Sequence, residues 1–317
     1  MLYKILFFPA KIALHFYCKK IFINNRKMLS QDGPLLIAAN HPNSFLDAII
    51  LSSLFKKPIH SLARGDAFAG NFFRKVLFSL NMLPVYRVSE GVENLEHNYT
   101  TFQACENLFK ENKIVLIFSE GLCKNEWHLR RLKKGTARLA LHAWDNGIPL
   151  KVLPLGFNYS SFRKFGKIVR LNFGGFILKT DLQNELASGK AVNEFNDLLR
   201  LQLEELVYEI APGDIQKRKE IFESEEPWYM SLAVLFPAIA GFILHAPLYY
   251  GAHFFVKGKA NDHYDSVMVG IFFLFYPIYI LLLTFIFYLI TWNPACFFLI
   301  ILMPITALCL LHFKKVI

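Results

Sequence analysis

Short apolar runs alternate with segments of helical periodicity along the first two thirds of the chain. The runs have the length of buried strands, and the segments between them repeat apolar residues at helical spacing. This alternation predicts an α/β domain. The predicted strands are Leu35 to Ala39, Pro58 to Ala63, Met82 to Tyr86, Lys113 to Ser119, Lys151 to Phe157 and Ile168 to Phe173, and the predicted helices are Ser44 to Phe55, Gly70 to Leu80, Val92 to Glu111, Gly135 to Asn146 and Asn193 to Ile210.

The last third of the chain has a different pattern, because charged residues nearly vanish after Trp228. Two segments, Ser266 to Ile290 and Pro294 to Phe313, approach the ~20 apolar residues that span a bilayer. They predict a transmembrane hairpin that turns at Thr291. The apolar stretch 229–256 precedes them and contains two histidines and two prolines.

Lysines flank the predicted hairpin on both sides. Lys257 and Lys259 precede it, and Lys314 and Lys315 follow it. The positive-inside bias then places both ends of the hairpin in the cytoplasm. This prediction makes 229–256 a re-entrant or interfacial element, with Pro237 and Pro247 breaking it into short helices.

The N-terminal segment interleaves apolar residues with Lys4, Lys11, Lys19 and Lys20. This pattern predicts an interfacial helix on an anionic leaflet within residues 1–30, and the alternative is a core helix with a solvated lysine face. We therefore divide the chain into this segment, an α/β domain at 31–215 and a hydrophobic membrane region at 228–317. The charged stretch Gln216 to Glu226 is the expected boundary.

Composition and charge narrow the possible partners. The chain is 54% hydrophobic and carries a formal net charge of +10. By itself that charge suits nucleic acid, anionic lipid or a phosphorylated substrate. Beside membrane segments it favours anionic lipid, and no motif suggests nucleic acid. The five cysteines are scattered, which argues for a reducing compartment and against a disulfide framework. No CxxC pair occurs, so we expect no metal site.

The stretch Ala39-Asn-His-Pro-Asn-Ser-Phe-Leu-Asp-Ala lies where a predicted strand gives way to a helix. His41 would stand near the positive end of the helix dipole, which favours the neutral imidazole that acts as a base. Asp47 would lie close to one turn into the helix and could fix the tautomer of the ring. Taken alone, the pair favours a capping histidine and a surface aspartate over a catalytic pair.

Three further stretches follow in order: Leu83-Pro-Val-Tyr-Arg, Ile117-Phe-Ser-Glu-Gly and Val152-Leu-Pro-Leu-Gly. With His41 and Asp47 they resemble the four blocks of the glycerolphosphate and lysophospholipid acyltransferase family. The resemblance implies a mixed sheet flanked by helices, followed here by a C-terminal helical transmembrane region.

The same resemblance implies transfer of an acyl group to a hydroxyl of glycerol-3-phosphate or lysophosphatidate in phospholipid synthesis. Acyl-CoA or acyl carrier protein would be the co-substrate, with no cofactor, and the domain would face the cytoplasm at the cell membrane. His41 resembles the general base and Asp47 its orienting partner. The residues that resemble the family's acceptor-binding blocks are Arg87, Glu120, Gly121, Lys133 and Lys134.

Two departures from the family pattern bear on the acceptor. Five residues separate His41 from Asp47, where most members have four, so the turn before Ser44 must absorb one residue. The third block continues Leu122-Cys123 in place of the usual Thr-Arg, which removes one phosphate donor. Lys124, Arg130 or Arg131 would replace it, or the acceptor is another lysolipid or an amino-lipid precursor.

Two other functions compete with acyl transfer. A hydrolase would use His41 to activate water, but the sequence has no convincing serine elbow. A membrane-anchored lipid-binding protein of the same fold would have little or no catalysis, which the intact His41 and Asp47 disfavour.

Overall fold

The computed structural model describes residues 2–86, 97–184, 189–223, 228–259 and 261–313. The strands are β1 (Cys18–Ile23), β2 (Leu35–Ala39), β3 (Ile59–Arg64), β4 (Met82–Val85), β5 (Ile114–Phe118), β6 (Lys151–Tyr159) and β7 (Lys167–Phe173). The helices are α1 (Leu2–Tyr17), α2 (Phe45–Leu54), α3 (Asn71–Ser79), α4 (His97–Lys110), α5 (Gly135–Asp145), α6 (Gly189–Leu206), α7 (Ile215–Phe222), α8 (Trp228–Ala233), α9 (Leu235–Val256), α10 (Tyr264–Thr291) and α11 (Leu299–Phe313).

Within the described residues the strands form one mixed sheet in the order β1-β7-β6-β2-β5-β3-β4. The strand β2 is parallel to β5 and β6, and β3 is parallel to β4 and β5. The neighbours β6 and β7 are joined by a short turn, which only an antiparallel pair permits. The sheet therefore has a parallel centre with an antiparallel edge.

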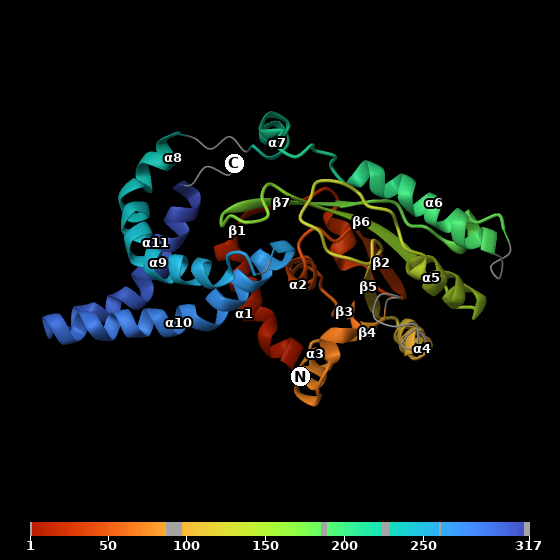
Figure 1. Ribbon diagram of the computed structural model, residues 1–317, viewed down its shortest axis with the longest axis horizontal. Helices are drawn as coiled ribbons and strands as arrows, with labels where there is room; N and C mark the ends of the chain where they lie inside the picture. The colour runs from red at the N-terminus through yellow and green to blue at the C-terminus, as the bar shows by residue number, and fades with distance from the viewer. Residues whose placement is uncertain (1, 87–96, 185–188, 224–227, 260, 314–317) are drawn as a thin grey trace. The chain divides into compact units, whose positions relative to one another are not determined.

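The central strand β2 is buried along its whole length, which explains its continuous apolar sequence. On one face of the sheet, α4, α5 and α6 pack over β2, β5 and β6 in a single hydrophobic cluster. Trp144 of α5 meets Phe195 of α6 with ring centroids 5.9 Å apart. Figure 1 shows α5 and α6 side by side over the sheet. This packing holds the strand ends that carry the candidate site.

The six predicted strands and five predicted helices all occur, with bounds shifted by a few residues. Part of the third predicted helix, 92–96, lies outside the described residues. Two elements differ from the sequence prediction. The helix α1 ends at Tyr17, and Cys18–Ile23 is a strand, because pairing with β7 overrides the helical pattern. The stretch Gln216 to Glu226, which was expected to separate the domains, begins inside the helix α7.

Three helical segments are long and apolar enough to cross a membrane, counting only described residues: Leu235–Val256, Asn261–Thr291 and Pro294–Phe313. The prediction that prolines break 229–256 into short helices is wrong for most of that stretch. The helix α9 is continuous through Pro247, although Figure 1 shows it bending along its length. Neighbouring helices can supply partners for the backbone groups that proline leaves unpaired. The placement of 229–256 as a re-entrant or interfacial element stays a prediction.

The chain forms two compact units, and each is assembled from separated stretches of sequence. The first contains 1–9, 22–158 and 170–212, and the second contains 10–21, 159–169 and 213–317. The break between 212 and 213 lies close to the expected boundary at 215, and the division into three functional parts stays a prediction. The stretches 10–21 and 159–169 belong with the hydrophobic helices.

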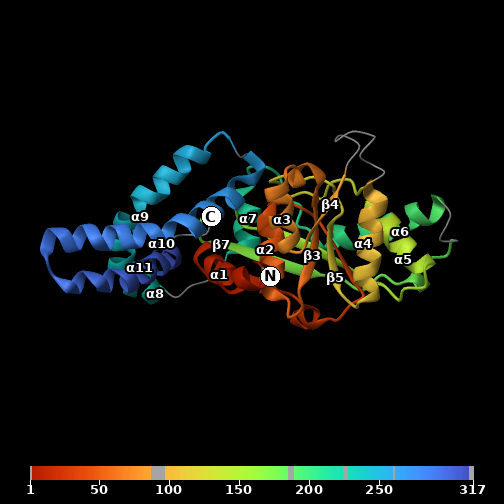
Figure 2. The ribbon, with the colours of Figure 1, turned by 90° about the horizontal axis from the view of Figure 1, so that it is seen from below.

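Within the second unit, both ends of the α10–α11 hairpin contact those two stretches. At the start of α10, Asp265 accepts hydrogen bonds from the Tyr17 hydroxyl and the Lys167 ammonium, and all three residues are buried. At the end of α11, the Lys19 ammonium donates to the His312 carbonyl at 3.0 Å. Figure 2 shows the two helices running alongside each other as a hairpin.

Candidate active site

The candidate site forms where β2 gives way to α2. His41 lies two residues after the strand, and Asp47 lies in the first turn of the helix. The Nδ1 atom of His41 is 2.9 Å from Oδ2 of Asp47. The Asp47 side chain is fully buried, whereas that of His41 is 18% exposed. The structure thus brings the two residues together, and their catalytic roles stay a prediction.

The turn between His41 and Asp47 contains a backbone position of unusual geometry at Ser44. This residue is the N-cap of α2, and its φ of 53° is unfavourable for any residue except glycine. Its side chain makes no capping hydrogen bond. Asp47 instead accepts the backbone N–H of Asn43 at 2.8 Å, so one carboxylate holds both the turn and the imidazole.

The imidazole of His41 stacks on Phe118, the last residue of β5. The ring centroids are 3.7 Å apart and the planes are 15° from parallel. The stack fixes one face of the ring, and Asp47 holds Nδ1, so Nε2 is the nitrogen left to accept a proton. Sequence reasoning missed this contact, although Phe118 stands only two positions before Glu120.

Glu120 connects the ends of β2 and β5 through backbone groups. Its Oε2 accepts the N–H of His41 and its Oε1 accepts the N–H of Arg130, each at 2.8 Å. The residue is 5% exposed. Burial raises the pKa of Glu120, and the two N–H donors, Arg130 first and His41 second, oppose part of that rise. Both carboxylate oxygens therefore hold the backbone of the site, a role that sequence reasoning missed.

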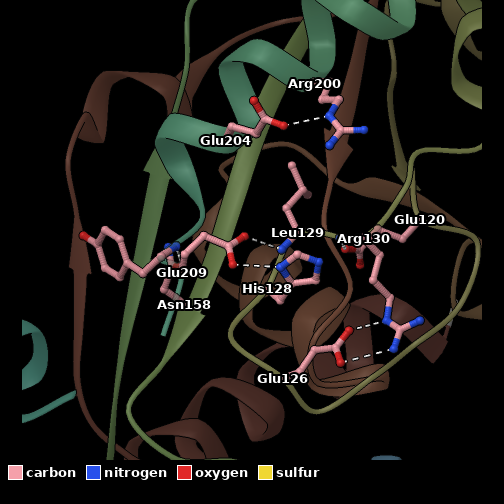
Figure 3. A network of polar contacts seen from close by, with 10 residues as sticks. Glu120, Glu126, His128, Leu129, Arg130, Asn158, Arg200, Glu204 and Glu209 are labelled. Atoms are coloured by element: carbon pink, nitrogen blue, oxygen red, sulfur yellow. Dashed lines mark hydrogen bonds and ion pairs between the residues drawn. The ribbon is translucent and has the colours of Figure 1, made fainter. Parts of the chain in front are cut away.

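The loop between β5 and α5 packs against the site through a set of polar contacts (Figure 3). Arg130 donates to the carboxylate of Glu126 through Nε and, at 3.2 Å, through Nη2. Glu209 accepts from the backbone N–H of Leu129 at 2.9 Å and lies 2.8 Å from Nδ1 of His128. These contacts anchor the loop, so its N–H groups stay in place beside Glu120.

The acyltransferase family model matches residues 20–158. The matched stretch contains His41, Asp47 and Glu120, which the structure assembles at one edge of the sheet. Residues 20–158 form an acyltransferase-family domain. Among solved structures, the chain is similar to the 1-acyl-sn-glycerophosphate acyltransferase PlsC of Thermotoga maritima, with 13% identity, a TM-score of 0.43, and coverage of 70% of this chain and 82% of that one. No curated relative shows a significant match.

Two more of the predicted binding residues lie together in this acyltransferase domain. Gly121 adopts a φ of 68°, and a Cβ built there would be 3.0 Å from Cγ of Lys133. The lysine stem therefore lies directly over Gly121, and a side chain at that position would fit only if the stem moved by a few tenths of an ångström. Lys134 is exposed and forms the N-cap of α5. Arg87, the remaining predicted binding residue, lies outside the described residues.

The residues that replace the family's Thr-Arg pair lie near the catalytic candidates. The Sγ atom of Cys123 accepts the backbone N–H of Ser44 at 3.1 Å, and the backbone N–H of Lys124 donates to the His41 carbonyl at 3.2 Å. Of the three basic residues considered as substitutes for the missing arginine, Arg130 is already paired with Glu126. Lys124 and Arg131 are exposed.

Proposed function

We propose that this protein transfers a fatty acyl group from acyl-CoA or acyl carrier protein to a hydroxyl of glycerol-3-phosphate or lysophosphatidate. The observation that carries the proposal is the 2.9 Å contact between His41 Nδ1 and the buried Asp47 carboxylate, inside an acyltransferase-family domain. A buried carboxylate beside one ring nitrogen prepares the other nitrogen to act as a base.

The chemistry follows from that arrangement. The acceptor hydroxyl gives its proton to Nε2 of His41 as its oxygen attacks the thioester carbonyl. The imidazolium that forms is stabilised by Asp47. When the tetrahedral intermediate collapses, the carbon–sulfur bond breaks and the thiolate leaves, taking up the proton from His41. The ester product and a free thiol result, and the histidine returns to its neutral form.

Positive charge beside the catalytic pair suits a phosphorylated acceptor. Lys133 lies over Gly121, next to the glutamate that holds the backbone of His41. Its exposed ammonium can reach a phosphate as a point charge, and Arg87 would bind one through its forked guanidinium. Lysophosphatidate and glycerol-3-phosphate both carry a phosphate and a free hydroxyl, so both fit this chemistry.

The test is an assay of the full chain in detergent or lipid with radiolabelled acyl-CoA and with acyl carrier protein loaded with the same chain. The acceptors are glycerol-3-phosphate, lysophosphatidate and lysophosphatidylethanolamine. We expect labelled product with one of the phosphate monoesters. His41→Ala and Asp47→Asn should each lower kcat by about 10²- to 10⁴-fold, because general-base catalysis is typically worth that much.

Matched controls separate catalysis from general damage. His142→Ala and Asp145→Asn make the same changes on the exposed side of α5 and should leave the rate unaltered. Release of thiol without any acceptor would indicate a hydrolase instead. Activity of His41→Ala within about twofold of the parent would contradict the role of His41 as the base.

We also propose that the catalytic domain faces the cytoplasm, where both acyl donors are found. The two ends of the α10–α11 hairpin contact the same part of the second unit, which supports placing both ends on one side of the bilayer. Lys259→Cys and Lys315→Cys should then react with an impermeant thiol reagent from one side of oriented vesicles, and Asn293→Cys from the other. Labelling of positions 259 and 315 from opposite sides would contradict the hairpin.

A further inference from the structure

Exposed apolar side chains gather on the chain segments that follow three neighbouring strands. Ala39 of β2 pairs with Phe118 of β5, and Ser61 of β3 pairs with Leu116, so the carboxyl ends of these strands are level. His41 and Glu120 emerge at that edge of the sheet. The apolar residues on the segments that follow are Phe45 after β2, Leu122 after β5, and Phe72 and Phe73 after β3.

The helix α3, which follows β3, is the most exposed of these segments. Each of its residues is at least partly exposed, and Phe72 and Phe73 are 72% and 61% exposed. Their rings pack edge to face, with centroids 5.6 Å apart. Phe78 packs back onto buried Phe68 with centroids 5.4 Å apart and so attaches the helix to the domain. The two exposed rings remain as an apolar surface in contact with solvent.

The charge beside this surface indicates what covers it. Arg74 and Lys75 directly follow the two phenylalanines and are also exposed. Exposed aromatic rings next to basic residues on a short helix are the combination found where helices lie in the interface of an anionic leaflet. The same chain carries helices long enough to cross a bilayer, so a leaflet is available to the domain.

We propose that α3, with Phe45 and Leu122, seats the sheet edge that carries His41 on an anionic lipid leaflet. The phenylalanines of α3 enter the boundary between headgroups and acyl chains, and Arg74 and Lys75 contact lipid phosphates. For catalysis, the proposal rests on the proposed function: a lipid acceptor then reaches His41 by lateral diffusion within the membrane, and its acyl chain never crosses water.

The direct test is photocrosslinking of the full chain in vesicles that contain phosphatidylglycerol. A p-benzoylphenylalanine replaces Phe72 in one variant and Tyr99 in a second. Tyr99 is the matched control, because it is an aromatic residue 80% exposed on α4 of the same unit. We expect lipid adducts at position 72 to exceed those at position 99 by about fivefold or more, as insertion into the interface requires.

A second pair of variants examines the charges. Arg74→Gln combined with Lys75→Gln should lower the adduct yield at position 72 in vesicles with phosphatidylglycerol and leave it unchanged in purely zwitterionic vesicles. Equal lipid adducts at positions 72 and 99 would overturn the proposal, as would crosslinks at position 72 to protein alone. The experiment needs no enzyme turnover, so lipid adducts without acyl transfer would refute only the proposed function.

Discussion

The buried pair of Lys167 and Asp265 offers a sharp test of how the second unit is held together. Both side chains are completely buried, and the Tyr17 hydroxyl donates to the same carboxylate. The Lys167 ammonium also lies 4.8 Å from the centroid of the Tyr17 ring. Replacing Asp265 with asparagine removes the counter-charge and keeps the shape. The ammonium must then lose its proton or remain buried without a compensating charge.

Removal of one partner from a buried ion pair typically costs about 3–5 kcal/mol. A chain of this size should lose roughly 5–15 °C in Tm for such a change. Replacement of both partners by apolar residues of similar volume is often neutral, so Lys167→Met with Asp265→Leu should recover most of the loss. The double variant should also carry Tyr17→Phe, because the hydroxyl would otherwise lack its acceptor.

The assay is thermal unfolding of the full chain in one detergent, followed by intrinsic fluorescence. The control is Glu204→Gln, which breaks the exposed ion pair with Arg200 and should cost at most about 1 kcal/mol. The reasoning is refuted if Asp265→Asn lowers Tm no more than this control. A combined variant as unstable as Asp265→Asn would show that the ionic pairing is not the source of the effect.

Three further predictions concern the site. Only glycine adopts the φ of Ser44 without strain, so Ser44→Gly should raise the free energy of unfolding by about 1 kcal/mol and keep acyl transfer. Ser44→Val should lower both stability and acyl transfer. Thermal unfolding and the acceptor assay measure the two effects. N-ethylmaleimide should inactivate the parent by modifying Cys123 beside the Ser44 N–H, and Cys123→Ala should resist it. The buried thiols of Cys18 and Cys105, whose pKa values burial raises to about 12, should stay unmodified in mass spectra. Burial raises the pKa of Glu120 above its ordinary 4.5, so the folded state holds a proton on this group at pH values where the unfolded state has lost it. The contribution of Glu120 to the free energy of unfolding therefore falls as pH rises through that window. Glu120→Gln should lack this pH dependence when unfolding is measured from about pH 4 to 7.

Much of the geometry of the candidate site is encoded locally and could be predicted from the sequence. The apolar run at 35–39 is a buried central strand, and the turn that follows brings His41 to Asp47 within a few residues. Such contacts depend on a single strand–helix junction. The blocks that contain His41 and Glu120 each follow a predicted strand. Because the carboxyl ends of parallel strands lie at one edge of a sheet, these residues were expected to lie close together.

The features that the sequence did not predict depend on contacts between segments that are distant in the chain. Glu120 was expected near the substrate, but its oxygens hold the backbone of residues 79 positions earlier and 10 positions later. The strand at Cys18–Ile23 resembled the end of a helix, because Lys19 and Lys20 continue the basic pattern and its partner β7 is remote in sequence. The helix α9 is continuous through Pro247 and packs against α10 and α11, which are formed by later parts of the chain.

The pairing of Lys167 with Asp265 also sets an order of events during synthesis. The two residues are 98 positions apart, so at about 5–20 residues per second the ribosome makes the lysine roughly 5–20 s before its counter-charge. During that interval Tyr17 and the turn between β6 and β7 cannot pack in their final form, and the Lys167 ammonium stays hydrated. We therefore expect the final packing of these early segments to follow delivery of α10 to the bilayer, which couples maturation of the protein to membrane insertion.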